Sequence, residues 1–181
     1  MNIVVAVNSD WGIGYGGRQT VVIPEDRARF RALTEGGAII VGRKTFESFS
    51  LSPPPHLQYG CGLPNRKNIV LTTSPEYAAY ATGNVVTVGS VEEALAEVED
   101  FPTDKVFVIG GGSVYRQFLP LSNEAYVTRI GVAPPSDAFF PDLSGIPGWV
   151  EESRSAVNES NGCEYVYEVW KNRRLKGAPH V

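Results

Sequence analysis

Continuous apolar runs alternate with amphipathic segments along most of the chain. A strand that is covered on both faces carries apolar residues at every position, as the strands of a parallel sheet do. Strands are therefore predicted at residues 2–7, 38–41, 69–71, 84–88, 106–109 and 125–130.

Four segments between these runs have the pattern of helices. The first begins at Ile23-Pro24-Glu25-Asp26, with a proline in its first turn and two acids where the helix dipole favours negative charge. The second covers residues 46–49. The third, at residues 90–99, opens with a capping box, and the fourth, at residues 113–119, ends before a proline.

The last part of the chain has a different pattern. Residues 150–157 and 164–170 alternate between polar and apolar positions around a turn at 158–162, which is typical of an antiparallel hairpin. We therefore predict an α/β fold: a mostly parallel sheet of about eight strands, an antiparallel C-terminal hairpin and four flanking helices. A single domain is expected at residues 1–172, followed by a flexible basic tail at 173–181.

Composition narrows the function classes. The net charge of −4 among 181 residues argues against a general nucleic-acid binder, which needs clustered positive charge. Two cysteines are too few for a disulfide framework, and the two histidines lie far apart in the sequence without the spacing of metal ligands. No apolar run approaches the roughly 18 residues of a membrane span. We expect a soluble, cytoplasmic, monomeric protein without metal.

Three consecutive glycines, Gly110 to Gly112, separate a predicted buried strand from a predicted helix. This arrangement brings backbone N–H groups and a helix N-terminus to one edge of the sheet, which suits a phosphate or another electron-rich group. The alternative is a tight turn that binds nothing.

Gly12, Gly14 and Gly17 match the letters of a dinucleotide fingerprint, but extended or loop sequence follows them where that fingerprint needs a helix. We interpret these glycines as the flexible part of a mobile flap.

A basic segment, Gly42-Arg43-Lys44-Thr45, follows the strand at 38–41. An enzyme that selects NAD places an acid at this position for the ribose hydroxyl, so the two cations favour the 2′-phosphate of NADP. The alternative is a solvated basic turn. Hydroxyls at Thr72 and Thr73 end the next strand, where they either extend the phosphate site or cap a helix.

Asp26 lies within the apolar stripe of the first helix, because Phe30 and Leu33 follow it by four and seven residues. A carboxylate in an apolar cleft is desolvated, which raises its pKa. The alternative is an ordinary acid that interacts with the helix dipole.

In their order and spacing, seven short motifs resemble the dihydrofolate reductase family over nearly the whole chain. They are Trp11-Gly12-Ile13-Gly14, Ile23-Pro24-Glu25-Asp26, Gly42-Arg43-Lys44-Thr45, Leu63-Pro64-Asn65-Arg66, Ile109-Gly110-Gly111-Gly112, Tyr126-Val127-Thr128-Arg129 and Phe140-Pro141-Asp142.

The resemblance implies hydride transfer from NADPH to C6 of dihydrofolate, with protonation at N5 promoted by Asp26 as the catalytic acid. It implies an adenosine-binding part at about residues 37–103 and a cis peptide between Gly110 and Gly111. The substrate residues it implies are Ala6, Arg27, Phe30, Phe49, Arg66, Ile109, Tyr115 and Thr128. The cofactor residues are Ala6, Ile13, Gly14, Gly42, Arg43, Lys44, Thr45, Leu71, Thr72, Thr73, Ile109, Gly111, Gly112, Ser113, Val114, Tyr115 and Gln117.

Three departures from the family pattern concern the substrate pocket. Gln19-Thr20-Val21 stands where the family usually has Leu-Pro-Trp, Arg27 replaces an apolar residue, and the loop at 50–62 is longer than usual. Two other hypotheses therefore stay open: a reductase of the same fold that acts on another heterocycle, such as a pyrimidine of riboflavin synthesis, or a nucleotide-binding module without catalysis.

Overall fold

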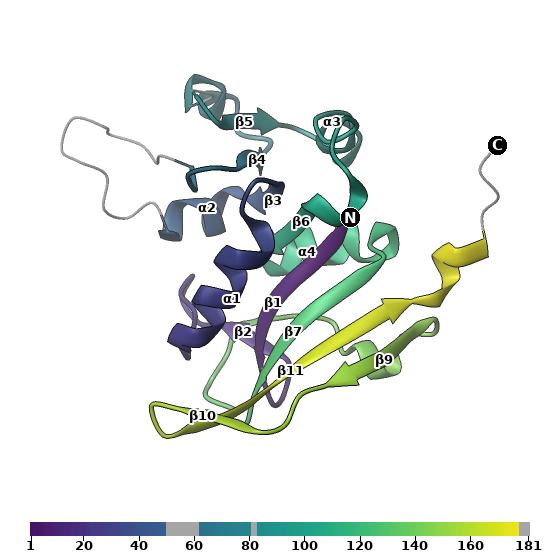
Figure 1. Ribbon diagram of the computed structural model, residues 1–181. Coiled ribbons are helices and arrows are strands. Elements are labelled where there is room, and N and C mark those ends of the chain that lie inside the picture. Colours follow the sequence, from purple (N-terminus) through teal and green to yellow (C-terminus); the bar gives the residue numbers. More distant parts are fainter. Residues whose placement is uncertain (50–61, 81–82, 178–181) are drawn as a thin grey trace.

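A nine-stranded sheet runs through the described residues of this computed structural model, which are 1–49, 62–80 and 83–177 (Figure 1). The spatial order is β10-β11-β7-β1-β6-β3-β4-β5, and β9 also pairs with β11. The strand bounds are β1 Asn2–Asn8, β3 Ala38–Gly42, β4 Lys67–Leu71, β5 Val85–Val88, β6 Val106–Gly110, β7 Glu124–Ile130, β9 Trp149–Arg154, β10 Asn158–Ser160 and β11 Cys163–Asn172.

Strand pairing from β5 to β7 is parallel, whereas β11 pairs antiparallel with β7, β9 and β10. The predicted mostly parallel sheet with an antiparallel C-terminal part is confirmed. A small second sheet that was not predicted joins β2, Gly12–Gly14, to β8, Ala138–Phe139.

Helices cover both faces of the sheet. They are α1 Pro24–Thr34, α2 Arg43–Phe49, α3 Val91–Ala96 and α4 Gly112–Phe118, with 3-10 turns at Pro75–Tyr80, Thr103–Lys105, Leu119–Leu121, Leu143–Gly145 and Arg173–Gly177. The predicted cap of α3 is present, because the Ser90 side chain accepts a hydrogen bond from the Glu93 amide at 3.1 Å. However, α3 ends at Ala96 rather than near residue 99.

The core explains the continuous apolar runs. On β3, Ile39 packs with Phe30 of α1, whereas Ile40 belongs to the cluster that contains Val114 and Phe118 of α4. Alternate residues of one strand thus face different helices, and both faces exclude water. Figure 1 shows α1, which carries Asp26, beside β1.

The C-terminal hairpin differs from its prediction. The segment predicted at 150–157 is interrupted after Arg154, so that β9 and β10 lie one after the other along β11 (Figure 1). The tight turn is Asn161-Gly162, whose φ angles of 52° and 75° are left-handed, as a two-residue hairpin loop requires. Strand β11 is long enough to pair with β10 and then with β9 along its length. The alternation of polar and apolar residues did not predict this division into two strands.

Two further observations concern the termini and the membrane. Within the segment expected to be a basic tail, Arg173 forms an ion pair with Glu152 of β9, and residues 173–177 form a 3-10 turn.

Among the described helices, none is long and apolar enough to cross a bilayer.

Candidate active site

The carboxyl ends of β3, β4 and β6 meet at one edge of the sheet. The register pairs Val41 with Gly110 and Gly42 with Leu71. The segments that begin at Gly42, Leu71 and Gly110, which were predicted separately to contact phosphates, are therefore neighbours. Ligands of open α/β sheets bind at such an edge.

Glycines at this edge permit an approach that side chains would prevent. A Cβ added to Gly42 would lie 2.9 Å from Cγ2 of Val114, and one added to Gly111 would lie 2.9 Å from Oγ1 of Thr45. A Cβ on Gly112 would lie 3.2 Å from the Phe139 carbonyl oxygen and 3.9 Å from Cδ1 of Ile13. The turn thus joins β6, α2, α4 and both strands of the small sheet.

The Gly110–Gly111 peptide bond is cis, as the resemblance implied. Tyr115, at the start of α4, is buried behind this turn, where its hydroxyl donates a hydrogen bond of 2.8 Å to the Val4 carbonyl. Its ring packs edge-on against Phe140 at 4.9 Å.

Arg43 opens α2 and is half-buried. Its guanidinium lies 3.9 Å from Glu47 and 5.5 Å from the centroid of the Tyr77 ring, and the Tyr77 hydroxyl donates to Glu47. This arrangement holds the side chain against the protein by weak, partly solvated contacts, which an anion of higher charge density would displace.

A hollow of about 220 Å³ lies at the ends of β4 and β5, close to the predicted phosphate residues. It is lined by Thr72, Thr73, Ser74, Pro75, Thr87, Val88 and Gly89. Lys44, Ser113 and Gln117 are exposed, and Gln117 donates to Ser113 within α4. Leu71 and Thr72 are half-buried.

Asp26 occupies the first turn of α1, where it faces β7. Its Oδ1 accepts a hydrogen bond of 2.5 Å from the Thr128 hydroxyl. Thr128 is 1 % exposed and pairs in register with Ala6 of β1, so the carboxyl lies over the neighbouring strands β1 and β7. The carboxyl is therefore not the solvated helix-start acid of the alternative hypothesis.

Burial, one hydrogen bond and two cations act on the pKa of this carboxyl. Burial raises the pKa of Asp26, and the Thr128 hydrogen bond, Arg29 and Arg27 partly oppose that rise. Burial also raises the pKa of Tyr115, and the Asp26 charge adds to the rise. Because burial is the largest of these influences, the pKa of Asp26 is higher than that of a solvated aspartate.

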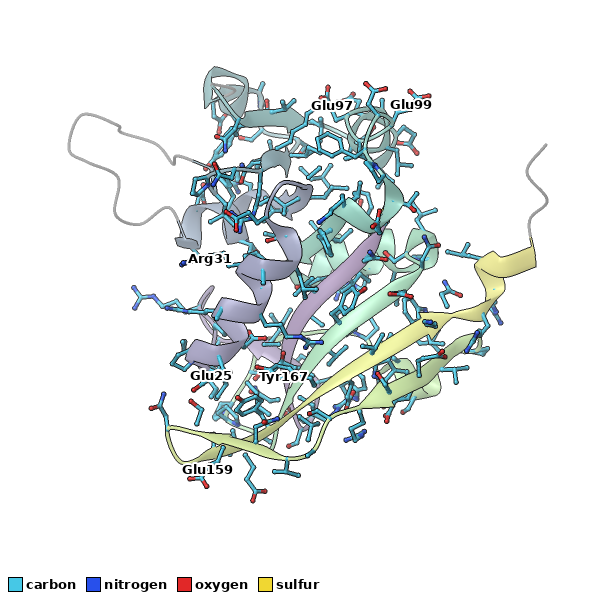
Figure 2. All side chains as sticks on the ribbon, viewed as in Figure 1. Glu25, Arg31, Glu97, Glu99, Glu159 and Tyr167 are labelled. Atoms are coloured by element: carbon cyan, nitrogen blue, oxygen red, sulfur yellow. The ribbon has the colours of Figure 1, made fainter. Side chains whose placement is uncertain are left out.

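Arg29 is a functional candidate that the sequence analysis missed. Its guanidinium lies 4.2 Å from the centroid of Tyr167 and 5.9 Å from that of Tyr126. Figure 2 shows Tyr167 beside the first turn of α1, near Glu25. The sequence could have indicated Arg29, because a residue three positions after Asp26 lies on the same helix face. Arg27, the predicted substrate residue, is exposed.

Arg66 lies buried at the other end of α1, with 7 % exposure. Its Nε donates to Thr34 at 2.8 Å, and its two terminal nitrogens donate to the Pro64 and Arg31 carbonyls at 2.6 and 3.2 Å. In the described part of the chain no carboxylate pairs with it within 4.0 Å. Because a guanidinium has five N–H donors, about two stay available for a ligand.

Apolar residues connect Asp26 with Arg66. Phe30 and Ile109 are half-buried and pack against the cluster of Val4, Ile39 and Phe107. Phe49 ends α2, and its side chain lies outside the part of the protein that is described.

The first loop requires a correction. Gly12 and Gly14 belong to β2, and a Cβ on them would lie 2.3 Å from Oγ of Ser136 and 2.8 Å from the Arg18 carbonyl oxygen. These two glycines are thus required by close packing, whereas the interpretation as a flap attributed them to flexibility. In this loop, Gly16 and Gly17, with φ of 57° and 76°, have open space around them.

No group of three or more potential metal ligands is present among the residues that the structure describes.

Comparison with known proteins identifies the family. Residues 1–172 match the family model described as dihydrofolate reductase. The chain is 32% identical over 168 residues to a dihydrofolate reductase of Neisseria gonorrhoeae, covering 92% of this chain and 94% of that protein. It is 35% identical to the type 5 dihydrofolate reductase of Escherichia coli over 142 residues, or 78% and 79% of the two chains. The resemblance is confirmed: this chain belongs to the dihydrofolate reductase family.

Proposed function

We propose that this protein reduces 7,8-dihydrofolate to tetrahydrofolate with NADPH, and that Asp26 promotes protonation at N5 of the pterin. The supporting observation is the half-buried Asp26 carboxyl, which Thr128 holds over β1 and β7 in a chain of this family. An acid whose pKa is raised by burial is suited to keep a proton near the pH at which the enzyme works.

The substrate is proposed to lie along α1. Its pterin would hydrogen-bond to Asp26, its aromatic middle would pack on Phe30 and Ile109, and its terminal carboxylate would accept the unused donors of Arg66. Thr34, a partner of Arg66, lies eight positions after Asp26, which is about 12 Å of helix. That length suits an extended molecule with a heterocycle at one end and a carboxylate at the other.

The residues present also fit a nicotinamide dinucleotide. Backbone N–H groups at the start of α4 would meet a pyrophosphate, Arg43 supplies a positive charge, and Ile13 lies close to the same turn. When bound, the cofactor supplies the hydride. The chain contributes binding, orientation of the two rings and exclusion of water by Tyr115, Phe140 and the small sheet.

Replacement of Asp26 by asparagine tests the proposed acid. We expect the rate of hydride transfer to fall by roughly 10²–10⁴-fold, the usual contribution of a positioned acid. Folding is the control. Because burial raises the pKa of Asp26 in the folded state, the ionised carboxyl costs stability above its folded pKa, and that cost disappears as the pH falls toward its unfolded pKa. The amide of the asparagine variant has no such cost, so urea unfolding at pH 7 should show no loss of stability.

The measurement follows NADPH absorbance with dihydrofolate as substrate. Full activity in Asp26→Asn would contradict the role of Asp26. NADPH binding without turnover in the unsubstituted chain, or turnover only with a pyrimidine substrate, would contradict the proposed reaction.

Thr128→Val tests the hydrogen bond to Asp26. The hydroxyl stabilises the ionised carboxylate, so its removal should raise the pKa of Asp26 further. The rate of hydride transfer falls when the acid loses its proton, and we expect this fall to move to higher pH by about 1 pH unit. Thr128→Ser, which keeps the hydroxyl, is the matched control. A profile that moves to lower pH in Thr128→Val would refute the assignment.

Arg43→Ala tests the cofactor phosphate. We expect the affinity for NADPH to fall by about 1.5–3 kcal/mol through loss of charged hydrogen bonds, with little change for NADH. Titration calorimetry with both cofactors measures the difference. Lys105→Ala, an exposed cation at the opposite end of β6, is the control. Equal losses for NADPH and NADH would remove the argument for a 2′-phosphate contact.

Arg66→Lys tests the carboxylate contact. Lysine keeps the charge but lacks the planar fork that holds three protein acceptors and two ligand oxygens. We expect kcat/KM for dihydrofolate to fall about 10- to 100-fold. A dihydropterin substrate without the glutamate serves as the control, because it cannot use Arg66. The same loss with both substrates would mean that Arg66 supports the fold alone.

A further inference from the structure

Glu168 is a buried carboxylate that the proposed mechanism does not use. It lies in β11 with 0 % exposure, yet its two oxygens are surrounded by donor groups. Arg129 of β7 contacts both oxygens, at 2.8 and 3.3 Å, and Arg154 of β9 contacts one at 2.9 Å. The indole N–H of Trp170 donates to the other oxygen at 2.8 Å. A buried charge with this many partners is fixed in position.

The face of the Arg129 guanidinium makes a second contact, with the ring of Trp11. Its central carbon lies 3.8 Å from the ring centroid of Trp11, a close cation–π geometry. Because Glu168 fixes the orientation of the guanidinium plane, the position of the Trp11 ring is fixed as well. Trp11 also stacks on Phe140 at 6.1 Å and meets the edge of Trp170 at 6.3 Å.

Trp11 connects this cluster to the nicotinamide side of the proposed site. It stands directly before β2, in a left-handed conformation with φ of 66°, which a large side chain adopts only when its surroundings require it. Its carbonyl accepts the Phe140 amide at 2.9 Å. Two residues later Ile13 lies near Gly112, at the glycine turn.

Backbone hydrogen bonds also hold the loop, because the Phe140 and Asp137 amides donate to the Trp11 and Gly14 carbonyls at 2.9 and 3.0 Å. β2 has three residues and pairs only with the two residues of β8, which is too short a ladder to be stable alone. Farther along, the Gly16 amide donates to Asp137 in an exposed position, where water competes for the bond. The contact of Trp11 with Arg129 adds a side-chain restraint at the start of this segment, before the short ladder.

We propose that Arg129, oriented by Glu168, is a positioning residue for hydride transfer: through Trp11 it holds β2, and with it Ile13, against the glycine turn. Arg129 itself lies on the α4 face of the sheet, whereas Asp26 lies on the α1 face. The proposal rests on the proposed function for its kinetic consequence, but the restraint on the loop is a property of the chain alone.

The central experiment compares Arg129→Met with Arg154→Met. Both substitutions remove one cation from Glu168, but only Arg129 contacts Trp11, so Arg154→Met controls for the disturbed carboxylate. We expect Arg129→Met to accelerate amide hydrogen exchange in residues 9–18 about 5- to 30-fold, the loss expected for a desolvated cation–π contact. Arg154→Met should leave this segment unchanged. Exchange in β4, Lys67–Leu71, monitors global opening in both variants.

Kinetics provides a readout that general destabilisation would not produce. We expect the single-turnover rate of hydride transfer to fall by a similar factor in Arg129→Met, while the KM for dihydrofolate stays the same. Arg129→Lys should recover part of the loss, since it keeps the charge but not the planar stack. Trp11→Phe combined with Arg129→Met should be no slower than the slower single variant, because the two residues act through one contact.

Equal exchange in the loop for all variants, or equal acceleration by Arg129→Met and Arg154→Met, would overturn the proposal. So would additive kinetic losses in the double variant. If the unsubstituted chain does not reduce dihydrofolate, the proposed function fails, and the exchange measurement still decides whether Arg129 holds the loop.

Discussion

The arrangement at this edge of the sheet depends on side chains that pack directly against glycine backbone where β3 and β6 end. Val41 pairs with Gly110, and neither Gly42 nor Gly111 has room for a methyl group. This packing brings α2, α4 and the small sheet to one edge, where the proposed phosphate site combines a cation, a hydroxyl and backbone N–H groups. A side chain at the turn would separate these elements, and the charges around Arg43 would then lie apart from the rest of the site.

The pKa of Asp26 is set by influences that oppose one another. Burial alone would raise its pKa and cost stability, whereas a fully paired carboxylate would hold no proton at neutral pH. Thr128 and Arg29 act against the burial without forming a direct ion pair among the interactions described. Arg29 is itself held between two tyrosine rings, which limits how closely it approaches the carboxyl. Helix α1 therefore carries a cation, Arg29, that lowers the pKa of Asp26 without forming an ion pair with it among the interactions described.

The sequence predicted the parallel sheet and the helices because a strand buried on both faces must be apolar throughout, as Ile39 and Ile40 show. It did not predict β2 and β8, since Gly12 and Gly14 carry no side-chain pattern and their pairing depends on residues over a hundred positions away. Asp26 could be found from helical spacing, and Arg29 could have been found in the same way. The role of Arg129 could not, because its partners Trp11 and Glu168 meet it only after folding.

The two faces of the sheet contribute differently to one reaction site. The α1 face carries the groups proposed to contact substrate, of which Asp26 and Phe30 are half-buried and Arg66 is buried. The opposite face carries Glu168, Trp170 and Phe140, which are buried and hold the start of the first loop. Under the proposed role of Arg129, the start of the loop is held on one face, while Gly16 and Gly17, which have open space around them, lie farther along the loop. The residue that the opposite face holds in place and the glycines with open space around them thus lie in different parts of one short segment of the chain.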